Sequence, residues 1–219
     1  MSNPTPAPLP VLLSASVPDE VIGTPEAQRL YDYVAAIVAA LFDAGLSLVF
    51  GGHPTITPLV HQAVRARGEP RPSIDLFQLE RFRGEAPPEA LDGTVFERLH
   101  WVGDPALPIA ADLANLREPM VALARAAIFI GGKTTGFQGG KPGIRDEFER
   151  FRTHHPTGPV YLVGGAGGET ARIVTDANGQ DWECNGLQGE ARAVLHDSHA
   201  EHIVAAVIAR DLERYRRQP

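Results

Sequence analysis

Short apolar runs alternate with longer amphipathic segments along the chain. The runs are rich in branched residues and have the length of buried strands, whereas the amphipathic segments carry apolar residues at helical spacing. This alternation favours an α/β protein in which a central, mainly parallel sheet carries helices on both faces. The predicted strands are Val11–Leu13, Leu46–Phe50, Ser73–Leu79, Val95–Val102, Ala126–Ile130 and Val160–Val163.

The ends of the helices carry local signals. Thr24 precedes Pro25, a pair typical of an N-cap and a first helical position. Pro119 predicts a kink or a break near Arg117 in a later helix. Residues 81–93 resemble a polar loop, and 180–195 give no clear pattern. Helices are predicted at about 24–44, 57–67, 109–125, from 143, and 198–217, with Ser198 as the last cap and Ile203, Val204, Val207, Ile208 and Leu212 as the last buried stripe.

Several predicted strands run into turns of small residues. Glycine turns follow the strands that end at Phe50, Ile130 and Val163, and two serines follow the first strand. Because the carboxyl ends of parallel strands share one edge of the sheet, we expect the three glycine turns to converge on one pocket. The serines could contact a ligand or simply cap a turn. His53 could likewise contact a ligand or donate a proton, or it could make one backbone hydrogen bond in its turn.

The segment Ala126–Glu149 combines a buried strand, a glycine-rich loop and the start of a helix. This arrangement is typical of anion binding, because glycine lets the backbone approach the ligand and helix N–H groups face it. Lys133 and Lys141 are the only lysines among 20 basic residues, and both lie in this loop. Their placement could be a coincidence, or it could serve phosphate binding. The glycine spacing fits neither the Walker A loop nor the dinucleotide fingerprint.

Composition narrows the classes of function. The chain has 219 residues, enough for one domain over 11–219 after a proline-rich tail at 1–10. A net charge of −7 without a basic stripe argues against nucleic-acid and membrane-surface binding. One cysteine excludes an internal disulfide and a cysteine metal cluster, and the eight histidines are scattered. We therefore expect a cytoplasmic protein with no metal or cofactor.

The region from Arg117 to Glu147 resembles the SLOG superfamily of Rossmann-like nucleotide binders. Its LOG-type phosphoribohydrolases carry an RKxxM helix, an apolar strand and a PGGxGTxxE loop. Arg117 and Met120 match the helix, and Gly143 followed four residues later by Glu147 matches the end of the loop. The resemblance implies a single Rossmann-like domain. In a hydrolase, Arg117 and Glu147 would act on the N-glycosidic bond of a nucleoside monophosphate.

Three departures from the LOG pattern favour a different subgroup. Ile144 replaces the threonine, Glu118 replaces the lysine, and an insertion containing Lys133 and Lys141 separates the first glycine pair from Gly143. The chain looks closer to the SLOG domains that accompany sirtuin-like and TIR proteins in bacterial defence, such as the sensor domain of Thoeris systems. Those domains bind signals related to cyclic ADP-ribose. The resemblance also implies a homo-oligomer and a separate effector protein as partner.

Two functions follow as hypotheses: binding of an ADP-ribose-type nucleotide, and hydrolysis of a nucleoside 5′-monophosphate. Glu147 could accept hydrogen bonds from a ribose, act in hydrolysis, or only favour the dipole of its helix. The sequence does not identify the base or distinguish a linear from a cyclic ligand. The predicted ligand-binding residues are Ser14, Ser16, Gly51, Gly52, His53, Thr55, Arg117, Gly131, Gly132, Lys133, Thr134, Thr135, Gly140, Lys141, Gly143, Ile144, Arg145, Glu147, Gly165 and Gly167.

Overall fold

The computed structural model describes residues 8–68, 72–177 and 181–218, and strands and helices alternate as predicted. The strands are β1 (Pro10–Ser16), β2 (Ser47–Gly51), β3 (Ile74–Leu79), β4 (Arg98–Val102), β5 (Ala126–Gly131) and β6 (Val160–Val163). The α-helices are α1 (Pro25–Asp43), α2 (Thr57–Arg67), α3 (Ile109–Leu123), α4 (Gly143–His154), α5 (Gly168–Asp176), α6 (Glu190–Asp197) and α7 (Glu201–Arg216). Short 3-10 helices are η1 (Asp19–Val21), η2 (Glu80–Glu85), η3 (Pro88–Leu91) and η4 (Gly164–Ala166).

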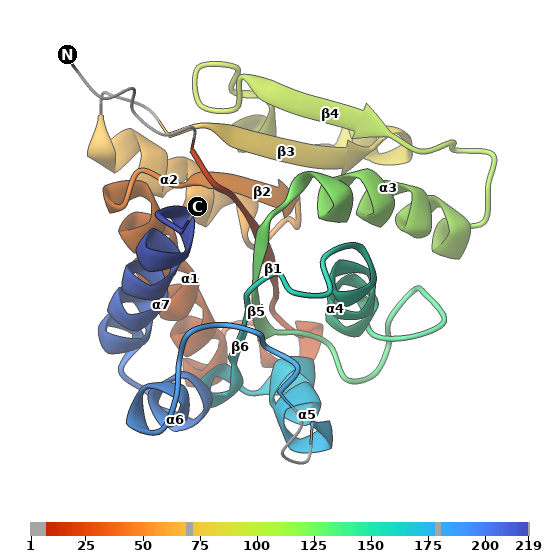
Figure 1. The fold of residues 1–219 in the computed structure, drawn as a ribbon. Helices are drawn as coiled ribbons and strands as arrows, with labels where there is room; N and C mark the ends of the chain where they lie inside the picture. Colours follow the sequence, from red (N-terminus) through yellow and green to blue (C-terminus); the bar gives the residue numbers. More distant parts are fainter. Residues whose placement is uncertain (1–7, 69–71, 178–180, 219) are drawn as a thin grey trace.

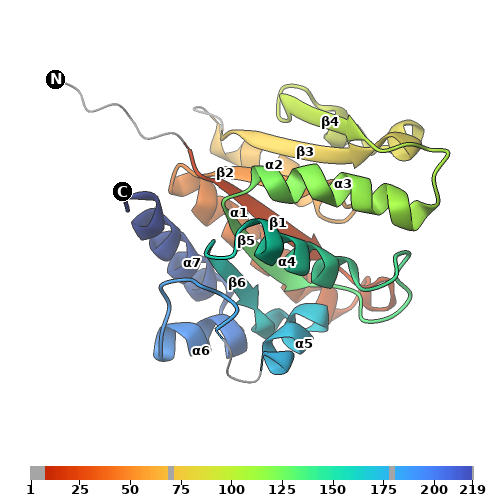
Figure 2. The ribbon, with the colours of Figure 1, turned by 45° about the vertical axis from the view of Figure 1, so that its right-hand side comes forward.

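The strands form one parallel sheet in the order β4-β3-β2-β1-β5-β6 (Figure 1). β1 lies at its centre, where Leu12 pairs with Val49 of β2 and with Ala127 of β5. Strands β2, β3 and β4 follow one another on one side of β1, and β5 and β6 lie on its other side. All five strand pairs are parallel, so the carboxyl ends of the strands share one edge of the sheet (Figure 2). The prediction of a single α/β domain with a mainly parallel sheet is confirmed.

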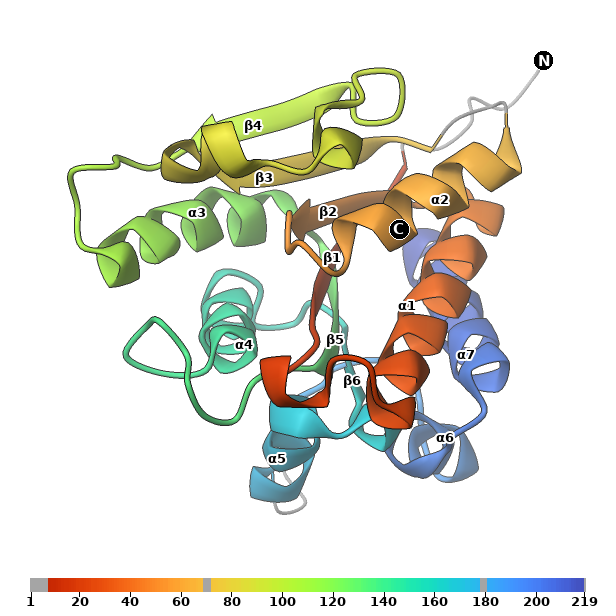
Figure 3. The same ribbon diagram turned by 180° about the vertical axis from the view of Figure 1, so that it is seen from behind.

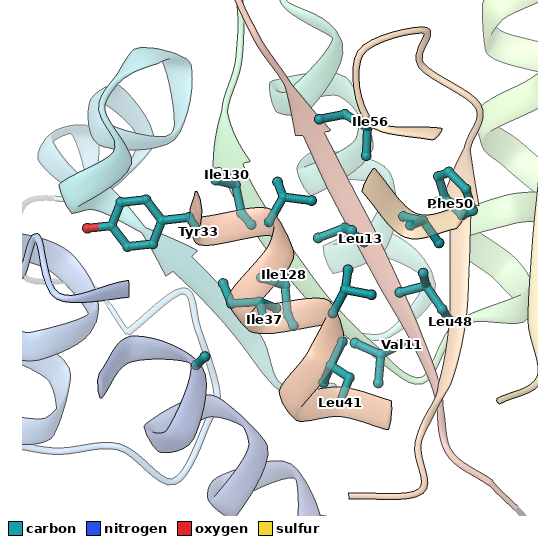
Figure 4. Close-up of a cluster of buried hydrophobic side chains, with 14 of the residues drawn as sticks. Val11, Leu13, Tyr33, Ile37, Leu41, Leu48, Phe50, Ile56, Ile128 and Ile130 are labelled. Carbon is teal, nitrogen blue, oxygen red and sulfur yellow. The ribbon is translucent and has the colours of Figure 1, made fainter. Parts of the chain in front are cut away.

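Helices cover both faces of the sheet. On one face, α1, α2 and α7 pack over the apolar side chains of the central strands (Figure 3). Figure 4 shows Ile37 of α1 beside Ile128 of β5 and Leu41 of α1 beside Val11 of β1. On the other face, α3, α4 and α5 bury a second cluster that includes Phe129. Burial on both faces explains why the strand sequences are continuously apolar.

Thr24 caps α1 as predicted, because its side-chain oxygen accepts a hydrogen bond from the Ala27 N–H at 3.4 Å. Helix α3 continues through Pro119, so the predicted alternative of a break near Arg117 is wrong, whereas a kink there stays a prediction. The predicted start of the last helix is also wrong. The last helix starts at Glu201, since Ser198 instead ends α6, and Ile203 is 54% exposed. The tail predicted at 1–10 lies mostly outside the described residues, and Pro10 already belongs to β1.

The glycine turn after β6 packs inside the fold. A Cβ on Gly165 would lie 2.2 Å from the Ser198 carbonyl oxygen, and one on Gly164 would lie 2.6 Å from that of His196. The Tyr33 hydroxyl donates a hydrogen bond to the same Ser198 carbonyl. Glycine at these positions therefore lets the turn approach the backbone between α6 and α7.

Replacing Gly165 with alanine should destabilise the fold by about 1–3 kcal/mol, because the added methyl overpacks a backbone contact. Gly93→Ala is the matched control, since nothing lies within 4 Å of its Cβ position, and we expect it to change stability by less than about 0.5 kcal/mol. Urea denaturation of the two variants measures the difference. Equal midpoints would contradict the packing role of Gly165.

Candidate functional site

A pocket of about 610 Å³ lies at the carboxyl edge of the sheet. Its wall comes from the ends of β1, β2 and β3, from α3, from the loop between β5 and α4, and from the first turn of α4. The order of strands reverses beside β1, and ligands commonly bind at such a point in open parallel sheets. The predicted site residues that line it are Ser14, Ser16, Gly51, Gly52, His53, Thr55, Arg117, Lys133, Lys141, Gly143, Ile144 and Glu147.

Arg117 projects from α3 and is held by two carboxylates of α4. Its Nη1 donates to Asp146 at 3.0 Å, and its Nε donates to Glu147 at 3.3 Å. The residue is only 8% exposed, so the paired carboxylates compensate a nearly buried charge. A Cβ on Gly143 would lie 2.9 Å from Nη2 of Arg117, so glycine here makes room for the guanidinium.

Burial is the main influence on the pKa of Glu147. Removal from water raises the pKa of its carboxyl, although nearby Arg117 and the hydroxyl of Ser14 oppose the shift. Ser14 is itself 3% exposed and lines the pocket beside this carboxylate. The pocket therefore contains an acid whose proton is held more tightly than usual, next to a guanidinium. Such a pair can contact a ribose or take part in proton transfer.

Met120 lies about one turn after Arg117 in α3 and packs against the end of β2. Its sulfur lies 3.5 Å from the position that a Cβ on Gly51 would occupy, and the residue is 1% exposed. The spacing of three residues places Met120 and Arg117 on one face of α3. Met120 therefore packs on the end of β2 from the side of α3 that carries Arg117 into the pocket wall.

Lys133 follows β5 and its side chain contacts the segment after the neighbouring strand β1. Its ammonium forms an ion pair with Asp19 in η1. That hydrogen bond and charge lower the pKa of the Asp19 carboxyl. The pKa of His53, in the turn after β2, is lowered by burial and by the positive charge of Lys133. Its Nδ1 accepts a hydrogen bond from the Thr55 backbone N–H at 3.4 Å, the kind of turn contact expected as one alternative, and lies 2.9 Å from Thr55 Oγ1. Contact of His53 with a ligand stays a prediction.

The first turn of α4 faces the pocket without a side-chain cap. Its N-cap is Pro142, which makes no capping hydrogen bond, and Gly143 and Ile144 line the pocket. Lys141 lies just before this turn and pairs with Glu149 and, at 3.6 Å, with Asp146. Free N–H groups, the helix dipole and a lysine together form a site suited to an anion.

Eight predicted site residues lie outside the pocket wall, and the contacts of Gly131, Gly132 and Arg145 explain their positions. Gly131 and Gly132 adopt positive φ values of 68° and 98° and join β5 to the end of β1 and the start of α5. Arg145 pairs with Glu169 and Asp176, so it points away from the pocket. Three loops were expected to converge, but the turn after β6 packs elsewhere. The remaining residues outside the wall are Thr134, Thr135, Gly140, Gly165 and Gly167.

Sequence reasoning missed one end of the pocket. Gln78 and Leu79 end β3, and Phe82 follows in η2, which was expected to be an irregular polar loop. Gln78 is a polar residue near the carboxyl end of an otherwise apolar strand, and this position could have identified it as a pocket residue. Leu116 and Phe137 complete the missed wall from α3 and from the glycine-rich loop.

Among the described residues, no group of three or more His, Cys, Asp or Glu side chains is placed to hold a metal ion. None of the described helices has the length and apolar character needed to span a bilayer.

Comparisons with known proteins agree with this architecture. The structure of TM1055, a structural genomics target, matches with a TM-score of 0.55 at 21% identity over 76% of this chain and 81% of that one, which shows a shared fold. None of the curated proteins that were compared matches the chain. The sequence profile of the SLOG cluster3 family matches residues 23–189, well over half of the chain. The protein therefore belongs to the SLOG cluster 3 family.

Proposed function

We propose that the pocket binds an ADP-ribose-type nucleotide, linear or cyclic. The observation that carries this proposal is the uncapped first turn of α4, which faces a pocket also lined by Arg117, Lys133 and Lys141. A volume of about 610 Å³ lies within the range of small-molecule sites. Membership of the SLOG family and the LOG-like fold suggest nucleotide-related binding or ribosyl hydrolysis.

The diphosphate would bind between Lys133 and the start of α4. Both lysines lining the pocket are already paired with carboxylates, so a phosphate must compete with Asp19 for Lys133. The Asp19 side chain is 72% exposed, and an exposed ion pair contributes little stability. A phosphate that also accepts hydrogen bonds from N–H groups of α4 can therefore displace it. Glu147, beside Ser14, would then accept hydrogen bonds from a ribose hydroxyl.

Hydrolysis of a nucleoside 5′-monophosphate is the second candidate. The raised pKa of Glu147 and its contact with Arg117 favour it, because such a carboxyl could protonate a leaving base or activate water. Ile144 argues against it. The isoleucine side chain packs where the motif places a threonine hydroxyl, with its Cδ1 2.7 Å from the Cβ position of Gly132. We therefore rank binding first.

The assembly and the cellular role are part of the same proposal. A nucleotide-binding sensor domain would act through an effector protein or through self-association. We propose a homo-oligomeric, cytoplasmic sensor of the kind that accompanies sirtuin-like and TIR proteins in bacterial defence. Neither a metal nor a further cofactor is invoked.

ADP-ribose should raise the melting temperature, whereas free adenosine should not, because the phosphates supply the main contacts. At 100 times the dissociation constant, the ligand would add about 2.7 kcal/mol to the free energy of unfolding. Differential scanning fluorimetry over a range of ligand concentrations measures the effect. Equal stabilisation by adenosine would contradict the phosphate contacts.

Lys133→Ala should weaken ADP-ribose binding roughly ten- to hundredfold, the cost of losing a charge-assisted hydrogen bond. Lys141→Ala should cost less, since that side chain is 45% exposed and paired with Glu149. Asp19→Asn should strengthen binding by up to about fivefold, because it frees Lys133. Isothermal titration calorimetry measures all three, and Glu20→Gln on the same exposed segment is the control. If Lys133→Ala bound ADP-ribose as tightly as the wild type, the proposal that the loop between β5 and α4 binds phosphate would be wrong.

Nucleoside monophosphates should remain intact with the wild-type protein if binding is the function. Chromatography of the incubated nucleotides detects any released base. If base is released, Glu147→Gln should abolish the release while Glu26→Gln, exposed on α1 and outside the pocket wall, should leave it unchanged. Release that depends on Glu147 would establish the hydrolase instead.

A further inference from the structure

Asp146 contacts three cationic side chains although it does not line the pocket. Its Oδ2 accepts a hydrogen bond from Nη1 of Arg117 at 3.0 Å. Its Oδ1 accepts one from Nε of Arg150 at 3.1 Å and lies 3.6 Å from Nζ of Lys141. Arg117 and Lys141 are both part of the pocket wall, and Asp146 is only 8% exposed, so water weakens these contacts little. Asp146 can therefore influence the pocket from behind its wall.

Ion pairs between α3 and α4 hold Asp146 in place. Arg150, about one turn after Asp146 in α4, also donates from Nη1 to Glu118 of α3 at 2.8 Å. Glu118 directly follows Arg117 in the sequence. A lysine at position 118, as in the hydrolase motif, would face Arg150 and repel it. The departure from the motif at Glu118 therefore belongs to the chain of ion pairs that fixes Asp146.

The contacts of Arg117 leave one of its nitrogens without a partner. Nε donates to Glu147 and Nη1 donates to Asp146, whereas Nη2 forms no hydrogen bond with any described residue. A Cβ on Gly143 would lie 2.9 Å from Nη2, so this nitrogen lies beside the first residue of α4. The unpaired N–H groups of Nη2 and the free N–H groups at the start of α4 are therefore neighbours, an arrangement that suits a phosphate.

We propose that Asp146 is a positioning residue of the pocket, which holds Nη1 of Arg117 so that Nη2 stays directed at an anion on the first turn of α4. The inference rests on the proposed nucleotide binding. The contact with Asp146 opposes rotation of the guanidinium, so the side chain is ordered before the ligand arrives and binding costs less. Glu147 differs, because it lines the pocket and can share its contact with the ligand.

Two variants that remove the same charge distinguish positioning from simple electrostatics. Asp146→Asn and Glu149→Gln each remove one negative charge from α4, and charge alone would make both variants bind an anion more tightly. Glu149 pairs with Lys141 and forms no ion pair with Arg117, so Glu149→Gln should strengthen ADP-ribose binding by up to about threefold. Asp146→Asn should instead weaken it roughly tenfold, because Arg117 loses its orientation. Isothermal titration calorimetry measures both.

A measurement without ligand tests the same contact. In the free protein, NMR of the guanidinium groups should give separate Nη1 and Nη2 signals for Arg117, because the contact with Asp146 slows rotation of the group. The two signals should merge in Asp146→Asn and stay separate in Glu149→Gln. Arg117→Lys, which lacks the guanidinium, assigns the signals.

The outcomes separate the two proposals. If wild type does not bind ADP-ribose, the proposed function is wrong, and the guanidinium signals alone decide the role of Asp146. Tighter binding by Asp146→Asn, or separate Nη signals that persist in it, would overturn that role while leaving nucleotide binding in place. If Asp146→Asn does not fold, the wild-type spectrum decides: separate signals for Arg117 would support the role, and one averaged signal would overturn it.

Discussion

A nearly buried guanidinium determines how this site is built. Arg117 would be strongly destabilising without partners, and Asp146 and Glu147 provide them from the facing helix. The two ion pairs join α3 to α4 above the end of β1. They also require glycine at 143, since the guanidinium occupies the space of a side chain there. The same contacts bring the uncapped start of α4 and the carboxyl of Glu147 into one pocket.

Much of the fold could be predicted because its signals are local or periodic. The apolar runs identified the strands, and Thr24 with Pro25 identified the start of α1. The motif led us to expect Arg117 and Glu147 in one site, and in the structure Nε of Arg117 lies 3.3 Å from Oε1 of Glu147. The motif alone gave no role to Met120, because its contact with Gly51 joins segments far apart in the sequence.

The rest depended on long-range packing. Glycine allows a close approach to a ligand and to another part of the backbone equally well, so Gly165 resembled a site residue although it packs beside Ser198. Gln78 was missed for the opposite reason: its surroundings are apolar, and the segment after it carried no ligand signal. Its contact with Gly52 exists only because β2 and β3 are neighbours in the sheet.

The lysines and the arginine of the pocket all have carboxylate partners, so recognition of an anion requires an exchange of partners rather than a simple excess of positive charge. A crystal structure with ADP-ribose tests this account most directly. The account predicts the diphosphate at the first turn of α4, with Lys133 turned from Asp19 to a phosphate oxygen. An ordered dinucleotide bound elsewhere, with the Lys133–Asp19 pair intact, would contradict it.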